Sequence, residues 1–326
     1  MSHPAPPAPP RAPPWWAWAA LAASTTLVGS YVGLSKVLVA VLPVFLLAWL
    51  RFGIAAVAMV HWLKRRPGEP PLSPGDRRLL FWESFLGNFL FSICMLYGVK
   101  LSGAVAAGVV MAGIPAAVAV GSWWLLRERV GPRIWAAVAC AAAGVLVLAL
   151  TRNLTGGDAA AAGGSASSAY AWGFVLLFGS VVCEASYVII GKRLTAQVSP
   201  RRISALINLW GLALVTPLGL WQASTFDFAG VAATTWGLLV FYALAASMIT
   251  VWLWMAGLGQ VPAAQSGVFM VMVPVSAAAV GVVVLGEPFS AGHAMAFALA
   301  LAGVLLATWP ARSRGAVDER PSTPPL

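Results

Sequence analysis

Charged side chains are scarce in this sequence, and their scarcity excludes most soluble folds. Asp, Glu, Lys and Arg make up 9% of the 326 residues, whereas soluble domains carry about 25%. Hydrophobic residues make up 60%, and the mean hydropathy is +0.85. So few ionic groups cannot cover a water-facing surface of this size. Lipid is therefore expected to surround most of the chain.

Cysteine and histidine are too few and too scattered for a metal site or a disulfide framework. Cys94, Cys140 and Cys183 each lie inside an apolar run, and no two of them form a Cys-x-x-Cys pair. His61 and His293 have no second ligand at metal-binding spacing. We also find no HExxH, paired-aspartate or P-loop motif. We therefore expect no metal and no cofactor, and neither a membrane-embedded enzyme nor a phosphate-driven pump.

The basic residues are distributed as orientation signals of a membrane protein. The net charge is +10, which in a soluble chain would suggest nucleic acid, but Lys and Arg fall in short loops between apolar runs. Counted by loop, 16 of the 20 lie on one side, three lie on the other, and Arg51 is inside a run. Basic loops stay in the cytoplasm and contact anionic lipid. Both termini are therefore expected to be cytoplasmic, with membrane lipid and no nucleic acid as partner.

Ten apolar runs are long enough for membrane-spanning helices, which need about 20 residues each. The runs do not alternate in polarity as barrel strands do. We therefore predict an all-α polytopic membrane protein with ten transmembrane helices. The runs are approximately 16–36, 43–63, 79–99, 103–125, 133–151, 171–191, 204–222, 233–255, 263–285 and 291–309.

The second half of the chain repeats the first. Residues 98–148 overlay 257–307 without a gap after a shift of 159, and the shorter segment Ser30-Tyr31-Val32 matches Ser186-Tyr187-Val188 after a shift of 156. Five helices per copy is an odd number, so the two copies must be inverted in the membrane. Inverted repeats are typical of alternating-access transporters. Matched pairs include Gly98 with Gly257, Pro115 with Pro274, and Glu128 with Glu287.

The repeat divides the chain into five parts. We predict a disordered Pro-rich cytoplasmic tail over 1–14, a first five-helix repeat over 15–151 and a flexible Gly/Ala/Ser linker over 152–169. A second repeat over 170–309 and a cytoplasmic tail over 310–326 follow. Because both halves are fused in one chain, a monomer is expected to be complete.

Two local motifs resemble the EamA family of the drug/metabolite transporter superfamily. One is Pro43 with the following Leu-Ala-Trp-Leu-Arg51-Phe, and the other is Pro274 with the later Leu-Gly-Glu287-Pro. The resemblance covers about 16–309 and implies a bacterial inner-membrane carrier of amino acids or other small metabolites. Asn208 stands near the position that Arg51 occupies in the first half, so the halves are not functionally equivalent.

Three ionisable residues inside apolar runs are candidates for transport: Arg51, Glu83 and Glu184. Glu184, beside Ser186 and Tyr187, is a candidate for proton coupling or for binding a substrate amine. The alternative is an ion pair between Glu184 and Arg51 that stabilises the bundle.

Arg51 is in turn a candidate ligand for a substrate carboxylate, or a charge partner that holds the fold. Glu83 lies near the end of its run, where an interfacial salt bridge with Arg77 or Arg78 is expected.

Two prolines and two glutamates of the repeat have mainly structural interpretations. Pro115 and Pro274 fall near the middle of their runs, where each is expected to kink or hinge a helix. The freed carbonyl groups could face a cavity, or the kink could only shape packing. Glu128 and Glu287 lie at helix ends and are expected to cap and orient them.

Together these features predict a secondary active transporter of small polar metabolites. The most specific expectation is proton-coupled, amino-acid-type export by alternating access across the bacterial inner membrane. A carrier of lipophilic drugs or nucleotide sugars on the same scaffold is the alternative.

Overall fold

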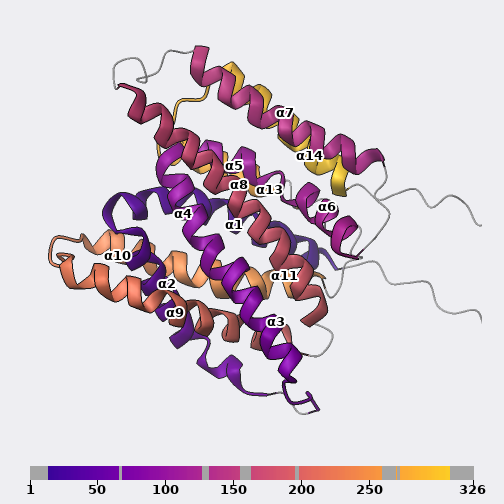
Figure 1. The fold of residues 1–326 in the computed structure, drawn as a ribbon, viewed down its shortest axis with the longest axis vertical. Helices are drawn as coiled ribbons and strands as arrows, with labels where there is room; N and C mark the ends of the chain where they lie inside the picture. The colour runs from indigo at the N-terminus through magenta and orange to yellow at the C-terminus, as the bar shows by residue number, and fades with distance from the viewer. Residues whose placement is uncertain are drawn as a thin grey trace, which may run out of the picture.

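The computed structural model is a bundle of helices (Figure 1). It describes residues 14–65, 68–126, 132–154, 163–194, 198–258, 269 and 272–308, and no strand occurs in these ranges. The prediction of an all-helical fold is confirmed. Within these ranges, five helices are long and apolar enough to cross a membrane: Trp15–Val41, Pro74–Ser102, Ser168–Gly191, Arg201–Thr225 and Ala233–Trp254. Five apolar helices are shorter: Val44–Ala58, Ala104–Val118, Trp135–Gly144, Met272–Val284 and Ala291–Leu306.

The elements follow the predicted apolar runs in order. The first half contains α1 (Trp15–Val41), α2 (Val44–Ala58), the short η1 (Val60–Leu63), α3 (Pro74–Ser84), η2 (Phe85–Leu90), α4 (Phe91–Ser102), α5 (Ala104–Met111), α6 (Ile114–Leu126) and α7 (Pro132–Leu154). The second half contains α8 (Gly163–Leu194), α9 (Pro200–Thr225), α10 (Ala233–Leu244), η3 (Ala245–Ile249), α11 (Thr250–Leu258), α13 (Met272–Ala279), η5 (Val280–Val284) and α14 (Ala291–Thr308).

The linker is shorter than predicted. Helix α7 continues to Leu154 and α8 begins at Gly163, so both ends of the predicted 152–169 linker are helical. Residues 155–162 lie outside the part of the chain that the structure describes.

The third run of each half contains a π-helical segment at the same place. Segment η2 covers Phe85–Leu90 and η3 covers Ala245–Ile249, so the 159-residue shift brings the two segments together. A π turn adds a residue to the helix and redirects the side chains on either side of it, and such turns are frequent at functional sites. Both halves therefore carry the same local distortion.

Pro115 lies at the beginning of a helix rather than in its middle, whereas the residues just before the helix of Pro274 lie outside the part of the chain that the structure describes. The fourth predicted run breaks at Ala112 and Gly113, and Pro115 is the second residue of α6. Pro274 is the third residue of α13. Proline has no N–H to donate, so the first turn of a helix is the position that tolerates it. The run is therefore broken just before Pro115, rather than kinked within one continuous helix.

Helix pairing follows a two-fold pattern. Equivalent helices pack on each other, α2 on α9 and α7 on α14, and Figure 1 shows these two pairs on opposite sides of the bundle. Other contacts occur in equivalent pairs in which the two halves swap roles. Helix α1 packs on α11 as α8 packs on α4, and α1 packs on α13 as α8 packs on α6. The largest buried cluster gathers side chains from both halves between these pairs.

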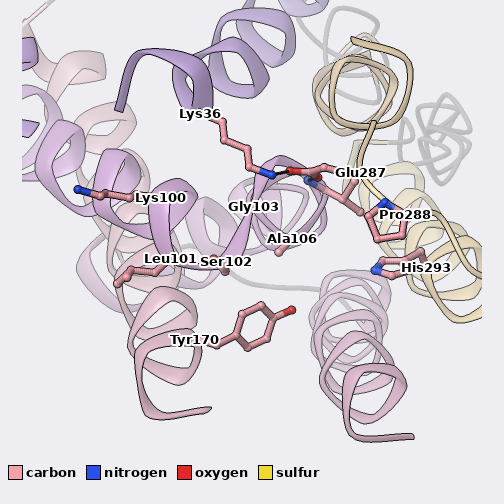
Figure 2. A pocket seen from close by; sticks show the side chains of 11 residues that line it. Lys36, Lys100, Leu101, Ser102, Gly103, Ala106, Tyr170, Glu287, Pro288 and His293 are labelled. Carbon is pink, nitrogen blue, oxygen red and sulfur yellow. Dashed lines mark hydrogen bonds and ion pairs between the residues drawn. The ribbon is translucent and has the colours of Figure 1, made fainter. Parts of the chain in front are cut away.

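One glutamate of the second half caps a helix of the first. Glu287 follows η5, and its carboxylate accepts hydrogen bonds of 2.9 Å from each of the Ala104 and Val105 amides at the start of α5. The same carboxylate forms an ion pair with Lys36 of α1 (Figure 2). The preceding Gly103 has a φ of +89°, which only glycine adopts without strain. Its repeat partner Glu128 lies outside the residues that the structure describes.

The Glu287 carboxylate is held in its ionised form. Burial alone would raise its pKa, but the Lys36 ammonium and the two backbone amides of α5 lower it further than burial raises it. The positive end of the α5 dipole acts in the same direction. The net result is a pKa below the ordinary range for a glutamate.

We expect Glu287→Gln to lower the free energy of unfolding by about 1–2 kcal/mol at pH 7. The contribution of the ion pair is kept small in this value because Lys36 is partly exposed and solvent screens its charge. Since the folded-state pKa of Glu287 is lowered, its contribution is full above the unfolded value of about 4.3 and is lost as the pH falls through the folded value. Thermal unfolding in detergent at several pH values measures this. Asp227→Asn, at an exposed loop residue, is the control. A stability difference that is the same at every pH would contradict the interpretation.

Candidate functional site

Arg51 is buried inside the bundle without an acidic partner. It lies in the middle of α2 with 4% of its surface exposed. Its Nη2 donates to Asn88 Oδ1 at 3.2 Å and to Ser92 Oγ at 2.9 Å, and its guanidinium lies 4.3 Å from the centre of the Phe52 ring. Among the residues that the structure describes, Arg51 forms no ion pair, so the ion pair with Glu184 considered from the sequence is not formed.

The π turn of η2 connects Arg51 to the second half. Asn88, which accepts from Arg51, donates through Nδ2 to the Ile207 carbonyl of α9 at 3.0 Å. Ser84 Oγ donates to the same carbonyl at 2.7 Å, and Ser92 Oγ donates to the carbonyl of Asn88. A carbonyl inside a helix already accepts an intrahelical hydrogen bond from a backbone amide. The donations from Ser84 and Asn88 are therefore additional, specific contacts between helices. Arg51, Asn88 and Ile207 thus form one hydrogen-bonded chain across the two halves.

Two tyrosines pack beside this chain. Tyr242 of α10 is fully buried, and its ring centre lies 5.7 Å from the Arg51 guanidinium carbon. Tyr31 of α1 packs on Tyr242 edge to face, with 5.6 Å between the ring centres. The Tyr242 hydroxyl lies close enough to Arg51 to interact with its guanidinium, but the two do not form a hydrogen bond of ordinary geometry.

Glu184 of α8 interacts electrostatically with both tyrosines of the short repeat, Tyr31 and Tyr187. Tyr187 packs against Gly87 of η2 so closely that a Cβ on Gly87 would come within 2.4 Å of the Tyr187 Cβ. The neighbouring Ser186 donates to the Val182 carbonyl of its own helix at 2.9 Å, so the structure does not bring Ser186 to the cluster.

Glu83 and Asn208 are buried and incompletely hydrogen-bonded. Glu83 of α3 is 1% exposed, and its Oε2 has no hydrogen-bond partner. Arg77 and Arg78 are both exposed, and neither pairs with Glu83. The prediction of an interfacial salt bridge is therefore wrong. Asn208 of α9 donates to the Ser204 carbonyl at 2.9 Å, while its Oδ1 has no partner.

The structure thus brings together Arg51, Glu83, Glu184, Tyr187 and Asn208 in one region. Sequence reasoning missed four further members: Tyr31, Asn88, Ser92 and Tyr242. The short repeat contains Tyr31 as the equivalent of Tyr187, and the 159-residue shift places Tyr242 opposite Glu83. These two repeat correspondences could have identified Tyr31 and Tyr242 from the sequence. No sequence pattern distinguishes Asn88 or Ser92, since short polar residues are common inside apolar helices.

A separate cavity of about 310 Å³ lies beside the Glu287 cap (Figure 2). Lys36, Lys100, Tyr170 and His293 are among the residues that line it, and His293 Nδ1 accepts from the Ser290 amide at 3.1 Å. Both halves of the chain line this cavity. It is a polar opening at the end of the bundle where α5 begins.

The close contact between η2 and α8 gives a direct test of the site geometry. Gly87→Ala would place a methyl group against Tyr187, so we expect it to reduce stability by roughly 1–3 kcal/mol. Gly53→Ala is the matched control, because no atom lies within 4 Å of its added Cβ on α2. Thermal unfolding of both variants in one detergent gives the comparison. Equal stability of the two variants would show that η2 and α8 are not packed this closely.

Known proteins are similar to this chain in sequence, and a solved structure is similar in fold. The model of the EamA-like transporter family matches residues 14–150 and again 171–309. The uncharacterized transporter YetK of Bacillus subtilis is 34% identical over 292 residues, which covers 89% of this chain and 86% of YetK. The uncharacterized transporter YwfM of the same organism is 27% identical over 228 residues, covering 67% of this chain and 71% of YwfM.

A solved structure described only as "Crystal structure of protein" has the same fold. It superposes with a TM-score of 0.58 at 20% sequence identity and covers 88% of this chain and 95% of that one. The family model matches once in each half of the chain, over the same two regions that the internal repeat defines. The chain therefore belongs to the EamA-like transporter family.

Proposed function

We propose that this chain is a secondary active transporter that moves small polar metabolites across the bacterial inner membrane, most closely as a proton-coupled exporter of amino-acid type. The observation that carries the proposal is the burial of Arg51, with no acidic partner in the described part of the chain, at a place where helices of both halves meet. A buried charge is costly, and in membrane proteins such groups mark transport pathways. Membership of a transporter family agrees with this role.

The two-fold helix pairing supports alternating access. Pairs such as α1 with α11 and α8 with α4 correspond after exchange of the halves, and both halves carry a π segment at the same position. Two halves with matching contacts can exchange conformations at little cost in free energy, as inverted repeats do. The five shorter apolar helices complete the proposed set of ten spans.

The loop charges set the proposed orientation of the chain in the membrane. With both termini in the cytoplasm, Lys36 and Lys100 face outside. The cavity beside Glu287 would then open to the outer face, and the Lys36–Glu287 ion pair would hold α1 to the start of α5 on that side. Opening outward would require this contact to separate. The chain would act as a monomer, with membrane lipid around it.

Glu184 is the proposed site of proton coupling. A carboxylate enclosed by apolar helices favours its neutral form, so its protonation can change with the side to which it is exposed. Glu184 has no ion-pair partner among the residues that the structure describes, and it lies within electrostatic reach of Tyr31 and Tyr187. Its charge therefore acts directly on the region around Arg51. A nucleotide-sugar carrier would need several cations here, and Arg51 is the one cation of the described cluster.

Uptake of a labelled amino-acid mixture into proteoliposomes under an imposed pH gradient tests the proposal. We expect the wild type to accumulate label and Glu184→Gln to lose gradient-driven uptake by at least tenfold, because the amide cannot carry a proton. The variant should retain exchange of internal for external substrate, since exchange requires no net proton movement.

The control is Glu69→Gln, which removes a buried carboxylate from the Arg202–Glu69 ion pair outside the cluster. It should reduce uptake only as far as it reduces the amount of folded protein. Gradient-driven uptake by Glu184→Gln at the wild-type rate would remove Glu184 from the coupling mechanism. Lack of wild-type uptake of any solute would contradict transport itself.

A further inference from the structure

A groove of about 470 Å³ lies on the α2–α9 pair, which forms one side of the bundle (Figure 1). Val57 on its wall is 77% exposed, so the groove opens away from the protein. A Cβ added to Gly53 would meet no atom within 4 Å, so the missing side chain at this position leaves part of the space empty. The lining residues are all apolar: Trp49, Leu50, Gly53, Ile54, Val57 and Leu212.

The groove offers no side-chain hydrogen bond to an occupant. Among its lining side chains only Trp49 carries a polar atom, and its Nε1 already donates to Thr216 Oγ1 at 3.2 Å. An ordered water needs about two to four polar partners, and a polar metabolite needs partners as well. The groove therefore suits hydrocarbon, and it is separate from the buried cluster that Arg51 enters from the same helix.

The walls of the groove lead to cations at one end of the helix pair. Leu212, Ala205 and Arg201 follow at spacings of seven and four residues, so they lie on one stripe of α9. The Arg201 guanidinium carbon lies 5.8 Å from the centre of the Trp62 ring in η1, and Lys64 comes directly after η1. Both cations are exposed, and neither forms an ion pair with another described residue.

The neighbouring cations are already occupied within the protein. Arg202 Nη1 pairs with Glu69 Oε1 at 3.0 Å, and Arg65 Nε donates to the Glu69 carbonyl. These contacts hold the segment after η1 on the start of α9. Arg201 and Lys64 therefore remain as two fixed charges for a ligand outside the chain.

The distance from these cations to the far end of the groove corresponds to one leaflet of a bilayer. Lys64 and Trp49 are about 20 Å apart along the helix axis, at a rise of about 1.5 Å per residue. One leaflet, headgroups included, is about 20 Å thick. A lipid with its headgroup at Lys64 thus has its acyl chains level with the groove. The loop charges place this end in the cytoplasm, where the leaflet carries anionic lipids.

We propose that the groove and the two cations at its end bind one anionic phospholipid of the cytoplasmic leaflet. The lipid phosphate contacts Arg201 and Lys64, and an acyl chain fills the space at Gly53. Basic pockets beside transmembrane helices on the cytoplasmic side recognise such headgroups. Only the choice of leaflet rests on the proposed orientation of the chain.

The charges favour this occupant over a second copy of the chain. A dimer with its two-fold axis along the membrane normal would bring the same surface of both copies together at the same depth. Arg201 and Lys64 of one copy would then approach Arg201 and Lys64 of the other, where like charges repel. An anionic headgroup has the complementary charge.

Native mass spectrometry of the delipidated protein in detergent tests the site. The probes are dioleoyl phosphatidylglycerol and dioleoyl phosphatidylcholine, which have the same chains but differ in net charge. We expect the wild type to be a monomer that binds one phosphatidylglycerol about fivefold to tenfold more tightly than phosphatidylcholine, because each cation near the membrane surface favours the anionic lipid.

Gly53→Leu tests the groove, because its side chain would occupy the space of the acyl chain. We expect this variant to bind both lipids at least fivefold more weakly than the wild type. Gly237→Leu is the matched control, since a Cβ at this position of α10 also meets no atom within 4 Å, and it should bind as the wild type does. Thermal unfolding without lipid shows that both variants are folded.

Arg201→Gln tests the headgroup contact. We expect it to weaken the binding of phosphatidylglycerol about fivefold and to leave the binding of phosphatidylcholine unchanged. Lys100→Gln is the matched control, because it removes an exposed cation from the other end of the bundle. It should change the binding of neither lipid.

Each contrary outcome overturns one part of this inference. Equal binding of the two lipids by the wild type would overturn the headgroup assignment. Wild-type affinity in Gly53→Leu would overturn the groove as the place of the acyl chain. A wild-type dimer that Gly53→Leu dissociates would identify a second copy as the occupant instead of lipid. Lipid binding is measured without transport, so a failure of the proposed function would leave this site standing.

Discussion

The structure depends on keeping one guanidinium charged inside an apolar bundle. Arg51 is buried and has no carboxylate to neutralise it among the described residues. Its stabilisation comes from neutral dipoles and rings instead: the Asn88 amide, the Ser92 hydroxyl and the faces of Phe52 and Tyr242. Such partners orient the charge without cancelling it. The electric field of Arg51 therefore remains available to an anion that enters the site.

The π segments determine where these dipoles lie. Ser84 precedes η2 and Asn88 lies inside it, and both side chains donate to the single Ile207 carbonyl across the helix interface. The matching turn η3 follows Tyr242 in the second half. Local backbone distortion, repeated in both halves, thus builds the contact region from ordinary residue types.

Sequence alone predicted the helical fold because hydrophobic length and the repeat spacing are one-dimensional properties. It also identified Arg51, Glu83 and Glu184, since ionisable residues stand out in apolar runs. It could not predict which helices face each other, so it offered Glu184 as the partner of Arg51 where the structure has Asn88 and Ser92. For a related reason, Pro115 could be predicted only as a break or a hinge: the length of an apolar run does not show where a helix is interrupted.

The cap on α5 has a consequence for the synthesis of the protein. Val105 is separated from its acceptor, Glu287, by 182 positions in the chain, which include the end of the first half and most of the second. While the first half enters the membrane, the amides at the start of α5 must be hydrated or otherwise occupied, because the carboxylate that will hold them has not yet left the ribosome. The first half therefore reaches its final form only after almost all of the second has been translated. The two halves are copies in sequence, but they mature as one unit.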